Sequence, residues 1–151
     1  MVKFFFLLLL VIFSSCSLFN GFKKREFHYT DNNSPQKITL LIPKGFNDNK
    51  KIIDSSGNQQ QVFSYDNKTF LYFAFTADTA KEYQPIIKEN HLAKMHPAGG
   101  FFYKGRDSTG LYWRELRHGN FRAGYKNVSP EIEEKFDSAV NYAGYRRTGY
   151  R

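Results

Sequence analysis

The sequence predicts an α+β domain in which a largely antiparallel, twisted sheet of about six strands carries two packed helices. Short alternating or apolar runs separated by turn residues recur between residues 37 and 128, as in antiparallel hairpins. The run TFLYFAFTA at 69–77 is apolar on both faces, which is typical of a central strand and favours a helix-covered sheet over a barrel. The predicted order of hairpins, helix, meander and helix separates strands from helices and therefore indicates the α+β class.

The first sixteen residues, MVKFFFLLLLVIFSSC, indicate where the protein is located. A basic residue, Lys3, precedes an unbroken apolar run from Phe4 to Phe13. That run has ten residues, about half of the roughly 20 that a membrane-spanning helix needs. Residues 1–15 are therefore interpreted as a signal peptide that is removed from the mature chain.

The segment Phe13-Ser14-Ser15-Cys16 resembles the lipobox of bacterial lipoproteins, although Phe13 stands where many lipoboxes have Leu. The resemblance implies cleavage before Cys16 and attachment of lipid, such as palmitate, to that residue. Two alternatives are an ordinary signal peptide cut after Ser15 and a retained N-terminal anchor. In similar lipoproteins, acidic residues just after the cysteine can act as an export signal, and none occurs here before Glu26. The resemblance thus favours the periplasmic face of an outer membrane.

After the signal peptide, residues 16–36 are interpreted as a lipidated tether, 37–144 as a single α+β domain and 145–151 as a basic aromatic tail. The chain has 22 Lys and Arg against 14 Asp and Glu, a formal charge of +8, and loss of Lys3 leaves +7. This balance favours acidic partners such as an envelope protein or glycan. Nucleic acid is set aside because no nucleic-acid motif is present.

The first half of the domain predicts strands that pair in succession. Ile38, Leu40 and Ile42 alternate with more polar neighbours and end at a Pro43-Lys44-Gly45 turn. Residues 51–53, 60–65 and 69–77 then form two hairpins. The stretch ITLLIPKGF at 38–46 resembles the opening of domains similar to the photosystem II oxygen-evolving extrinsic proteins, which implies a twisted sheet with flanking helices and an accessory, binding-type role.

The second half predicts a helix, a meander and a final helix. The first helix starts at the capping-box spacing of Thr79 and Glu82, or one turn later at Pro85, and runs toward Met95. Residues 101–106, 111–117 and 121–128 follow as strands, with Gly119-Asn120 as a two-residue hairpin turn.

The final helix carries the clearest pattern in the chain. Ser129 is its N-cap, Pro130 its first residue and Gly144 its end. Its apolar residues form one stripe that should lie across the sheet, namely Ile132, Phe136, Ala139, Val140 and Ala143.

Residues with catalytic or metal-binding chemistry form no recognisable constellation. No serine lies in a G-x-S-x-G context, and Cys16 is excluded as a nucleophile if it is acylated. His91 and His96 are five residues apart, whereas two ligands on one helical face are usually four apart, so no metal or cofactor is predicted. For the alternative function, a small envelope hydrolase or glycan-modifying protein, the only acidic residues nominated are Glu115 and Asp107.

A cluster of basic and aromatic residues on the predicted meander is the main candidate for a binding surface. Adjacent antiparallel strands would gather these side chains in one region of the sheet, and Arg and aromatic residues are enriched in recognition surfaces. Glu115 shares a face with Arg117 by strand alternation and could pair with Arg117 or with Lys104. The alternative is that the aromatic residues are core and the cations only solubilise the outer face. The predicted partner-binding residues are Tyr112, Arg114, Arg117, Arg122 and Lys126.

The sequence therefore predicts a lipid-anchored envelope protein that acts as a non-enzymatic binding or accessory module. One short motif bears on the source. Asp107-Ser108-Thr109, like Asp78-Thr79-Ala80 and Asp137-Ser138-Ala139, resembles the O-glycosylation motif of envelope proteins from Bacteroidetes-type bacteria.

Overall fold

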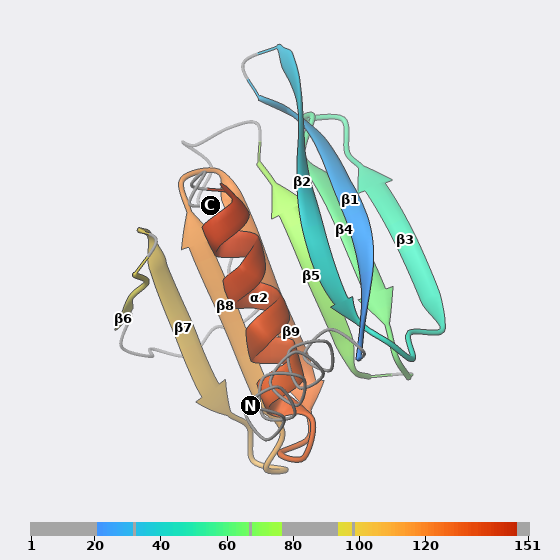
Figure 1. The fold of residues 1–151 in the computed structure, drawn as a ribbon, viewed down its shortest axis with the longest axis vertical. Coiled ribbons are helices and arrows are strands. Elements are labelled where there is room, and N and C mark those ends of the chain that lie inside the picture. Colours follow the sequence, from blue (N-terminus) through green and yellow to red (C-terminus); the bar gives the residue numbers. More distant parts are fainter. Residues whose placement is uncertain (1–20, 32, 67, 77–93, 98, 148–151) are drawn as a thin grey trace, which may run out of the picture.

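The described residues form a seven-stranded antiparallel sheet with a two-stranded hairpin and one helix on the same face (Figure 1). A computed structural model describes residues 21–31, 33–66, 68–76, 94–97 and 99–147. Within these residues the fold is mostly antiparallel β-structure with a single α-helix, which agrees with the predicted α+β class.

The large sheet has the strand order β3-β4-β5-β9-β8-β7-β6, and every neighbouring pair is antiparallel. The central strand β5 is buried along almost its whole length, as its apolar sequence predicts. The turn Gly119-Asn120 joins β8 to β9 with His118 opposite Phe121, so the predicted two-residue hairpin is confirmed. The strands are β3 (Asp48–Ile53), β4 (Gln59–Ser64), β5 (Phe70–Phe75), β6 (Lys94–Met95), β7 (Phe101–Arg106), β8 (Tyr112–His118) and β9 (Phe121–Val128).

The small sheet is a long hairpin of β1 (Phe22–Asp31) and β2 (Ser34–Pro43). Phe27 and Tyr29 on β1 are buried, and their rings contact Phe121 and Phe75 of the large sheet. The prediction of a tether over residues 16–36 is therefore wrong for the part of it that forms these strands. Alternating aromatic residues provide enough apolar area to hold this segment on the core, and the folded region begins before residue 37.

The helix α2 (Glu133–Arg147) packs on β2, β8 and β9 beside the hairpin. Phe136, Ala139, Val140 and Ala143 are buried as predicted, whereas Ile132 lies before the helix and is 36% exposed. The first residues after Ser129 form a tight turn, with the Ile132 amide donating to the Ser129 carbonyl at 3.2 Å. The helix thus starts later than predicted.

Gly144 does not end this helix. It lies inside α2, where a Cβ would come within 2.5 Å of Leu116 Cδ2 and 3.3 Å of His96 Cε1. The lack of a side chain at Gly144 allows this close contact with Leu116, and the helix continues past Gly144, so its predicted role as a C-cap is wrong. Residues 145–147 of the predicted tail continue the helix.

The predicted sheet differs from the observed one in strand number and in its helices. The large sheet has seven strands rather than about six, and β1 with β2 adds a second sheet. The predicted first helix falls mainly on residues 77–93, which lie outside the described residues. Lys94–Met95, at its predicted end, form the edge strand β6 instead.

A β-bulge shapes the end of β9. The pairing of β8 with β9 shifts register between Tyr112 and Arg114, and Asn127 has a φ of 59°. An extra residue on β9 lets Tyr125 and Val128, three positions apart, both face the core. The Asn127 carbonyl accepts from Thr69 Oγ1 at 2.8 Å, which secures the bulge to the start of β5.

Candidate functional site

The five predicted partner-binding residues lie on two opposite faces of the large sheet. Tyr112 packs against the core and Arg114 contacts α2, so both point to the covered face. Arg122 and Lys126 alternate with core residues of β9, and Arg117 alternates with buried Leu116, so these three point to the opposite face. The strand pairing is as predicted, but it does not gather the five side chains into one surface.

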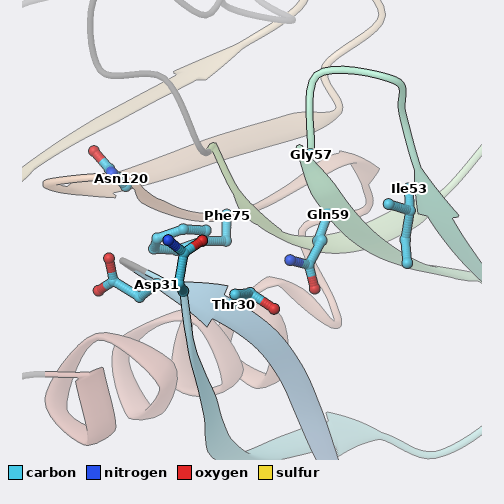
Figure 2. Close-up of a pocket in the computed structure, with 8 residues that line it drawn as sticks. Thr30, Asp31, Ile53, Gly57, Gln59, Phe75 and Asn120 are labelled. Atoms are coloured by element: carbon cyan, nitrogen blue, oxygen red, sulfur yellow. The ribbon is translucent and has the colours of Figure 1, made fainter.

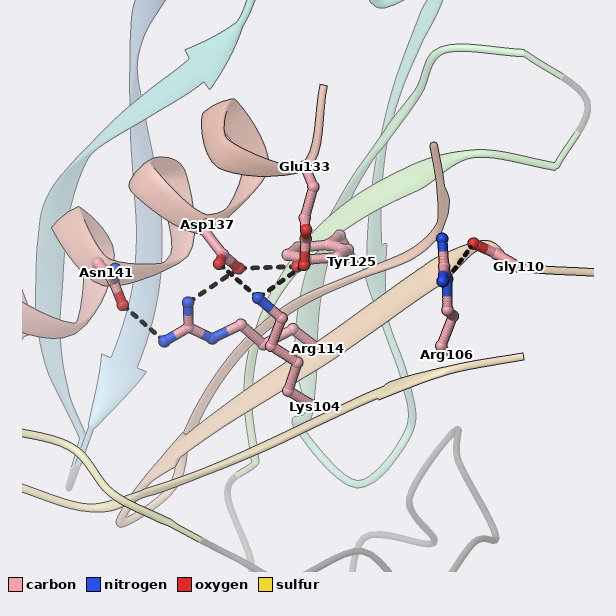
Figure 3. Close-up of polar contacts among 8 residues, drawn as sticks. All are labelled: Lys104, Arg106, Gly110, Arg114, Tyr125, Glu133, Asp137 and Asn141. Atoms are coloured by element: carbon pink, nitrogen blue, oxygen red, sulfur yellow. Dashed lines mark hydrogen bonds and ion pairs between the residues drawn. The ribbon is translucent and has the colours of Figure 1, made fainter. Parts of the chain in front are cut away.

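On the covered face, Arg114 is 5% exposed and is the central donor of a buried polar network. Its guanidinium forms an ion pair with Asp137 Oδ1 at 2.9 Å and donates to Asn141 Oδ1 at 2.7 Å (Figure 3). The same group lies over the ring of Phe102, 4.6 Å from its centroid. Arg114 therefore holds α2 on the sheet through its two terminal nitrogens, and its burial keeps it from an external partner.

Asp137 collects three donors in this network. Lys104 Nζ lies 2.9 Å from Oδ2, and Tyr125 donates its hydroxyl to Oδ1 at 2.7 Å. Burial alone would raise the pKa of Asp137, but the hydrogen bonds from Lys104, Arg114 and Tyr125 outweigh it and hold the pKa below its usual range. Asp137 is thus ionised at neutral pH and neutralises the cations around it.

Lys104 completes the network with a second carboxylate. Its ammonium is 2.6 Å from Glu133 Oε1 at the start of α2, in addition to its contact with Asp137. Burial lowers the pKa of Lys104, yet the two carboxylates more than reverse this and raise it. Two cations, Lys104 and Arg114, thus balance two anions, Glu133 and Asp137, and the covered face presents no net charge from these four groups.

On the opposite face, Glu115 is 1% exposed and is paired with two donors. The Tyr72 hydroxyl donates to Oε2 and Arg117 Nε donates to Oε1, each at 2.5 Å. The predicted pairing of Glu115 with Arg117 is confirmed, whereas Lys104 points to α2 instead. Arg117 also lies over the Tyr103 ring, 4.5 Å from its centroid, so its guanidinium is fixed in place.

A cross-strand row on this face brings the remaining cations next to an exposed aromatic ring. Phe101 of β7 is opposite Arg117 of β8, and Arg117 is opposite Arg122 of β9. Phe101 is 50% exposed, and the two arginines are half-buried. Phe101, Tyr103, Arg117 and Arg122 lie on this face together with Lys126, which is four residues further along β9; we call these five residues the meander surface.

The two carboxylates nominated for catalysis both have structural partners. Glu115 is occupied as above, and Asp107 Oδ1 accepts from the Thr109 amide and hydroxyl and from the Leu111 amide, at 2.7–2.9 Å. These bonds lower the pKa of Asp107, with the Thr109 contact as the largest cause, and they shape the β7–β8 turn. Neither carboxylate lines the cavity of about 570 Å³ or the cavity of about 410 Å³ that lie between described residues.

The larger cavity, of about 570 Å³, lies where the β1–β2 tip meets the β3–β4 and β8–β9 turns (Figure 2). Asp31, the one charged residue among the described residues of its lining, is paired with Arg147 at 3.2 Å. A second cavity of about 410 Å³ adjoins the bulge and the start of α2. The larger cavity is lined by Thr30, Asp31, Asn33, Ile53, Gly57, Gln59, Phe75 and Asn120.

Other sequence-based candidates are placed as follows. Across the described ranges, no three His, Cys, Asp or Glu side chains come close enough to hold a metal ion. His96 is buried, which is the main cause of its lowered pKa, while His91 lies outside the described residues.

In the described part of the chain, no helix has the length and apolar character to cross a membrane. Cys16 precedes the first described residue.

The three glycosylation-like motifs occupy different environments. Ser108 is exposed on the β7–β8 turn, and Ser138 is exposed on α2. Asp78-Thr79-Ala80 lies outside the described residues. Only the Ser108 motif therefore lies on a turn in the described structure.

Comparison with known proteins finds no family model, no curated protein and no solved structure that matches this chain. Its resemblances to lipoproteins and to the photosystem II extrinsic domains therefore remain predictions.

The helix residues of the polar network were not predicted from the sequence. Glu133, Asp137 and Asn141 recur every four residues and so lie on one side of α2, next to its apolar stripe. A polar stripe that borders the buried face of a helix indicates partners on the sheet beneath it. This spacing is the sequence feature from which the pairing of Arg114 and Lys104 with the helix could have been predicted.

Proposed function

We propose that this protein is a lipid-anchored envelope protein that acts as a non-enzymatic binding or accessory module. The observation that carries the proposal is the position of the sole cysteine. Cys16 directly follows a ten-residue apolar run and two serines, five residues before the first described residue. Acylation there would attach the domain to the periplasmic face of an outer membrane without a spanning helix.

The proposed cleavage would leave the described buried core in the mature chain. The buried apolar cluster extends from Phe27 to Ala143. Cleavage before Cys16 would leave every residue of that cluster in the mature chain. The mature domain would also contain no free thiol, which suits an oxidising compartment.

For the binding role, the meander surface is the region that we assign to an acidic envelope protein or glycan. Arg117 is held over Tyr103, and the exposed ring of Phe101 lies across from it. A positioned guanidinium next to aromatic area is suited to carboxylate groups. Tyr112 and Arg114, which point to α2, are not part of the assigned surface.

Anchoring is tested by comparing the parent with Cys16→Ser in a bacterium that processes lipoproteins. We expect intact-mass analysis of the parent to show loss of residues 1–15 and addition of acyl chains. We expect Cys16→Ser to lose the acyl mass and to move from the membrane to the aqueous fraction. An unmodified parent, or equal fractionation of the two proteins, contradicts the anchor.

The binding role is tested with a photo-crosslinking residue at position 101. We expect the protein with this residue and no other change to form adducts with an acidic envelope protein or glycan. We expect the added change Arg122→Glu/Lys126→Glu to abolish these adducts. The matched control Lys50→Glu/Lys51→Glu changes charge equally on the edge strand β3 and should keep the adducts. Unchanged adducts in the first variant remove the meander surface from the proposal.

A further inference from the structure

Four cations gather where the β1–β2 hairpin begins and ends, a region that we call the hairpin base. Lys23, Lys24 and Arg25 lie on β1, and Lys44 follows β2. The Lys44 amide donates to the Gly21 carbonyl at 2.8 Å, which holds the turn against the start of β1. All four cations are exposed. By strand alternation Lys23 and Arg25 lie on one face of the hairpin and Lys24 on the other, so the hairpin base is a positive end of the hairpin, next to the first described residues.

The charges of this patch are not neutralised within the described structure. Lys23 and Arg25 lie over the ring of Phe46, at 5.1 and 6.0 Å from its centroid, and Arg25 donates to the Lys24 carbonyl. No carboxylate of the described residues forms an ion pair with any of the four. The patch thus presents four positive charges to its surroundings.

The rest of the hairpin differs in charge. Glu26 pairs with Lys37 at 3.0 Å and with His28 at 3.2 Å, and Asp31 near the tip pairs with Arg147. Residues 26–37 contain Glu26, Asp31 and Lys37, which sum to −1 with His28 neutral. The hairpin is therefore polarised along its length, with its positive end nearest to the N-terminal side of the chain.

Chain length places this positive end close to the proposed anchor. Gly21 follows Cys16 by five positions, which at full extension span about 18 Å. A lipid on Cys16 would therefore keep the hairpin base within about two Debye lengths of the bilayer surface at physiological salt. Tethering at this range raises the effective concentration of lipid headgroups around the patch.

We propose that the hairpin base is a docking surface for anionic glycerophospholipid headgroups, which holds the anchored domain upright with the hairpin tip away from the bilayer. This inference rests on the proposed acylation of Cys16, because the anchor selects lipid over other polyanions as the occupant. These four lysine and arginine side chains have no carboxylate partner among the described residues and can each lie near phosphate groups. The cavity at the hairpin tip would then face away from the membrane.

The lipid contact is tested without the anchor, using the mature chain from residue 16 with Cys16→Ser, which retains the whole described core. Vesicles of phosphatidylglycerol and phosphatidylcholine are compared with vesicles of phosphatidylcholine alone by co-sedimentation. We expect binding to the anionic vesicles only. The variant Lys23→Gln/Lys24→Gln/Arg25→Gln/Lys44→Gln should bind on the order of a hundredfold more weakly.

A charge-matched control separates the patch from net charge. The variant Lys50→Gln/Lys51→Gln/Lys68→Gln/Lys135→Gln loses the same four charges at other exposed positions. We expect this control to bind within a few-fold of the parent domain. Equal weakening of the two variants, or no preference for anionic vesicles, overturns the proposal.

Orientation is tested with the native acylated chain in the same two kinds of bilayer. In anionic bilayers we expect Lys23, Lys24 and Lys44 to be protected from amine labelling, while Lys37 and Lys94 stay reactive. Uniform reactivity in an acylated chain overturns the docking while leaving the anchor intact. If the native chain carries no acyl groups, the proposed anchoring is contradicted instead. The vesicle assay still tests whether the hairpin base binds anionic lipid.

Discussion

The two faces of the large sheet use the same residue types for different purposes. On the face under α2, Arg114 and Lys104 meet Asp137 and Glu133, and the charges balance. On the opposite face, one carboxylate, Glu115, holds Arg117, while Arg122 donates to the Gly119 and Phe121 carbonyls. The difference shows that a basic strand sequence does not by itself indicate a binding surface. What matters is whether a neighbouring element supplies the anions.

The largest expected effect on stability comes from the apolar packing on the two faces. Phe73→Ala empties a fully buried position under the hairpin and should lower the free energy of unfolding by about 3–5 kcal/mol. The control Phe101→Ala removes the same atoms from a half-exposed position on the opposite face and should cost about 1 kcal/mol or less. Denaturant unfolding measures both. Equal losses would show that the two faces are equally well packed around these rings.

The next largest effect concerns the buried arginine. Arg114→Met leaves Asp137 with Lys104 and Tyr125 but without its closest guanidinium, and should destabilise the fold by about 3 kcal/mol. The matched change Arg122→Met, at a half-buried position, should cost about 1 kcal/mol. Thermal unfolding of the two variants checks this order. A larger loss of stability for Arg122→Met than for Arg114→Met would contradict the expectation that the arginine under α2 contributes more to stability.

A smaller effect should appear in the pH dependence of stability. The pKa of Asp137 is lower in the folded than in the unfolded chain, so its contribution to stability is complete above the unfolded value of about 3.9 and is lost as pH falls through the folded value. We expect Asp137→Asn to unfold more easily at neutral pH and to show a shallower loss of stability in acid. If the stability of the parent and of Asp137→Asn falls equally as pH decreases, other carboxylates account for the loss of stability in acid.

The smallest effect is expected from His96, which packs between α2 and the sheet edge. Burial lowers the pKa of His96, so the folded protein binds this proton less readily than the unfolded chain. Stability should therefore fall as pH drops from about 6.5 toward the folded value, and His96→Gln should remove that slope. Chemical unfolding between pH 7.5 and 5, in steps of about half a unit, measures it. A slope that persists in His96→Gln assigns it to another group.

Much of the fold could be predicted because local patterns specify strands and turns. The alternation in residues 37–43, the glycine turn at 119–120 and the apolar stripe of the last helix each correspond to an observed element. The first hairpin strand was not predicted, because Phe27 and Tyr29 stand in a mostly polar segment that is typical of a tether. Their alternation was present in the sequence, but its significance depends on β2 and β5 lying beside it.

The candidate site was predicted less well because burial depends on a partner element distant in sequence. Alternation correctly placed Glu115 with Arg117, since that relation lies within one strand. It could not show that Arg114 would meet Asp137 and Asn141, more than twenty residues later in the chain. The same limit applies to Gly144, whose close contact with the Leu116 side chain depends on the packing of α2 against β8.

By itself, the sequence determined the strands of the meander, the apolar face of α2 and the short chain between Cys16 and the fold, because these depend on residue period and chain length. The tertiary structure alone decided which cations are neutralised. Arg114 and Lys104 lie under a helix that brings two carboxylates, whereas Lys23, Lys24, Arg25 and Lys44 have no carboxylate partner among the described residues. Charge balance is a property of spatial neighbours, and strand alternation specifies only a face.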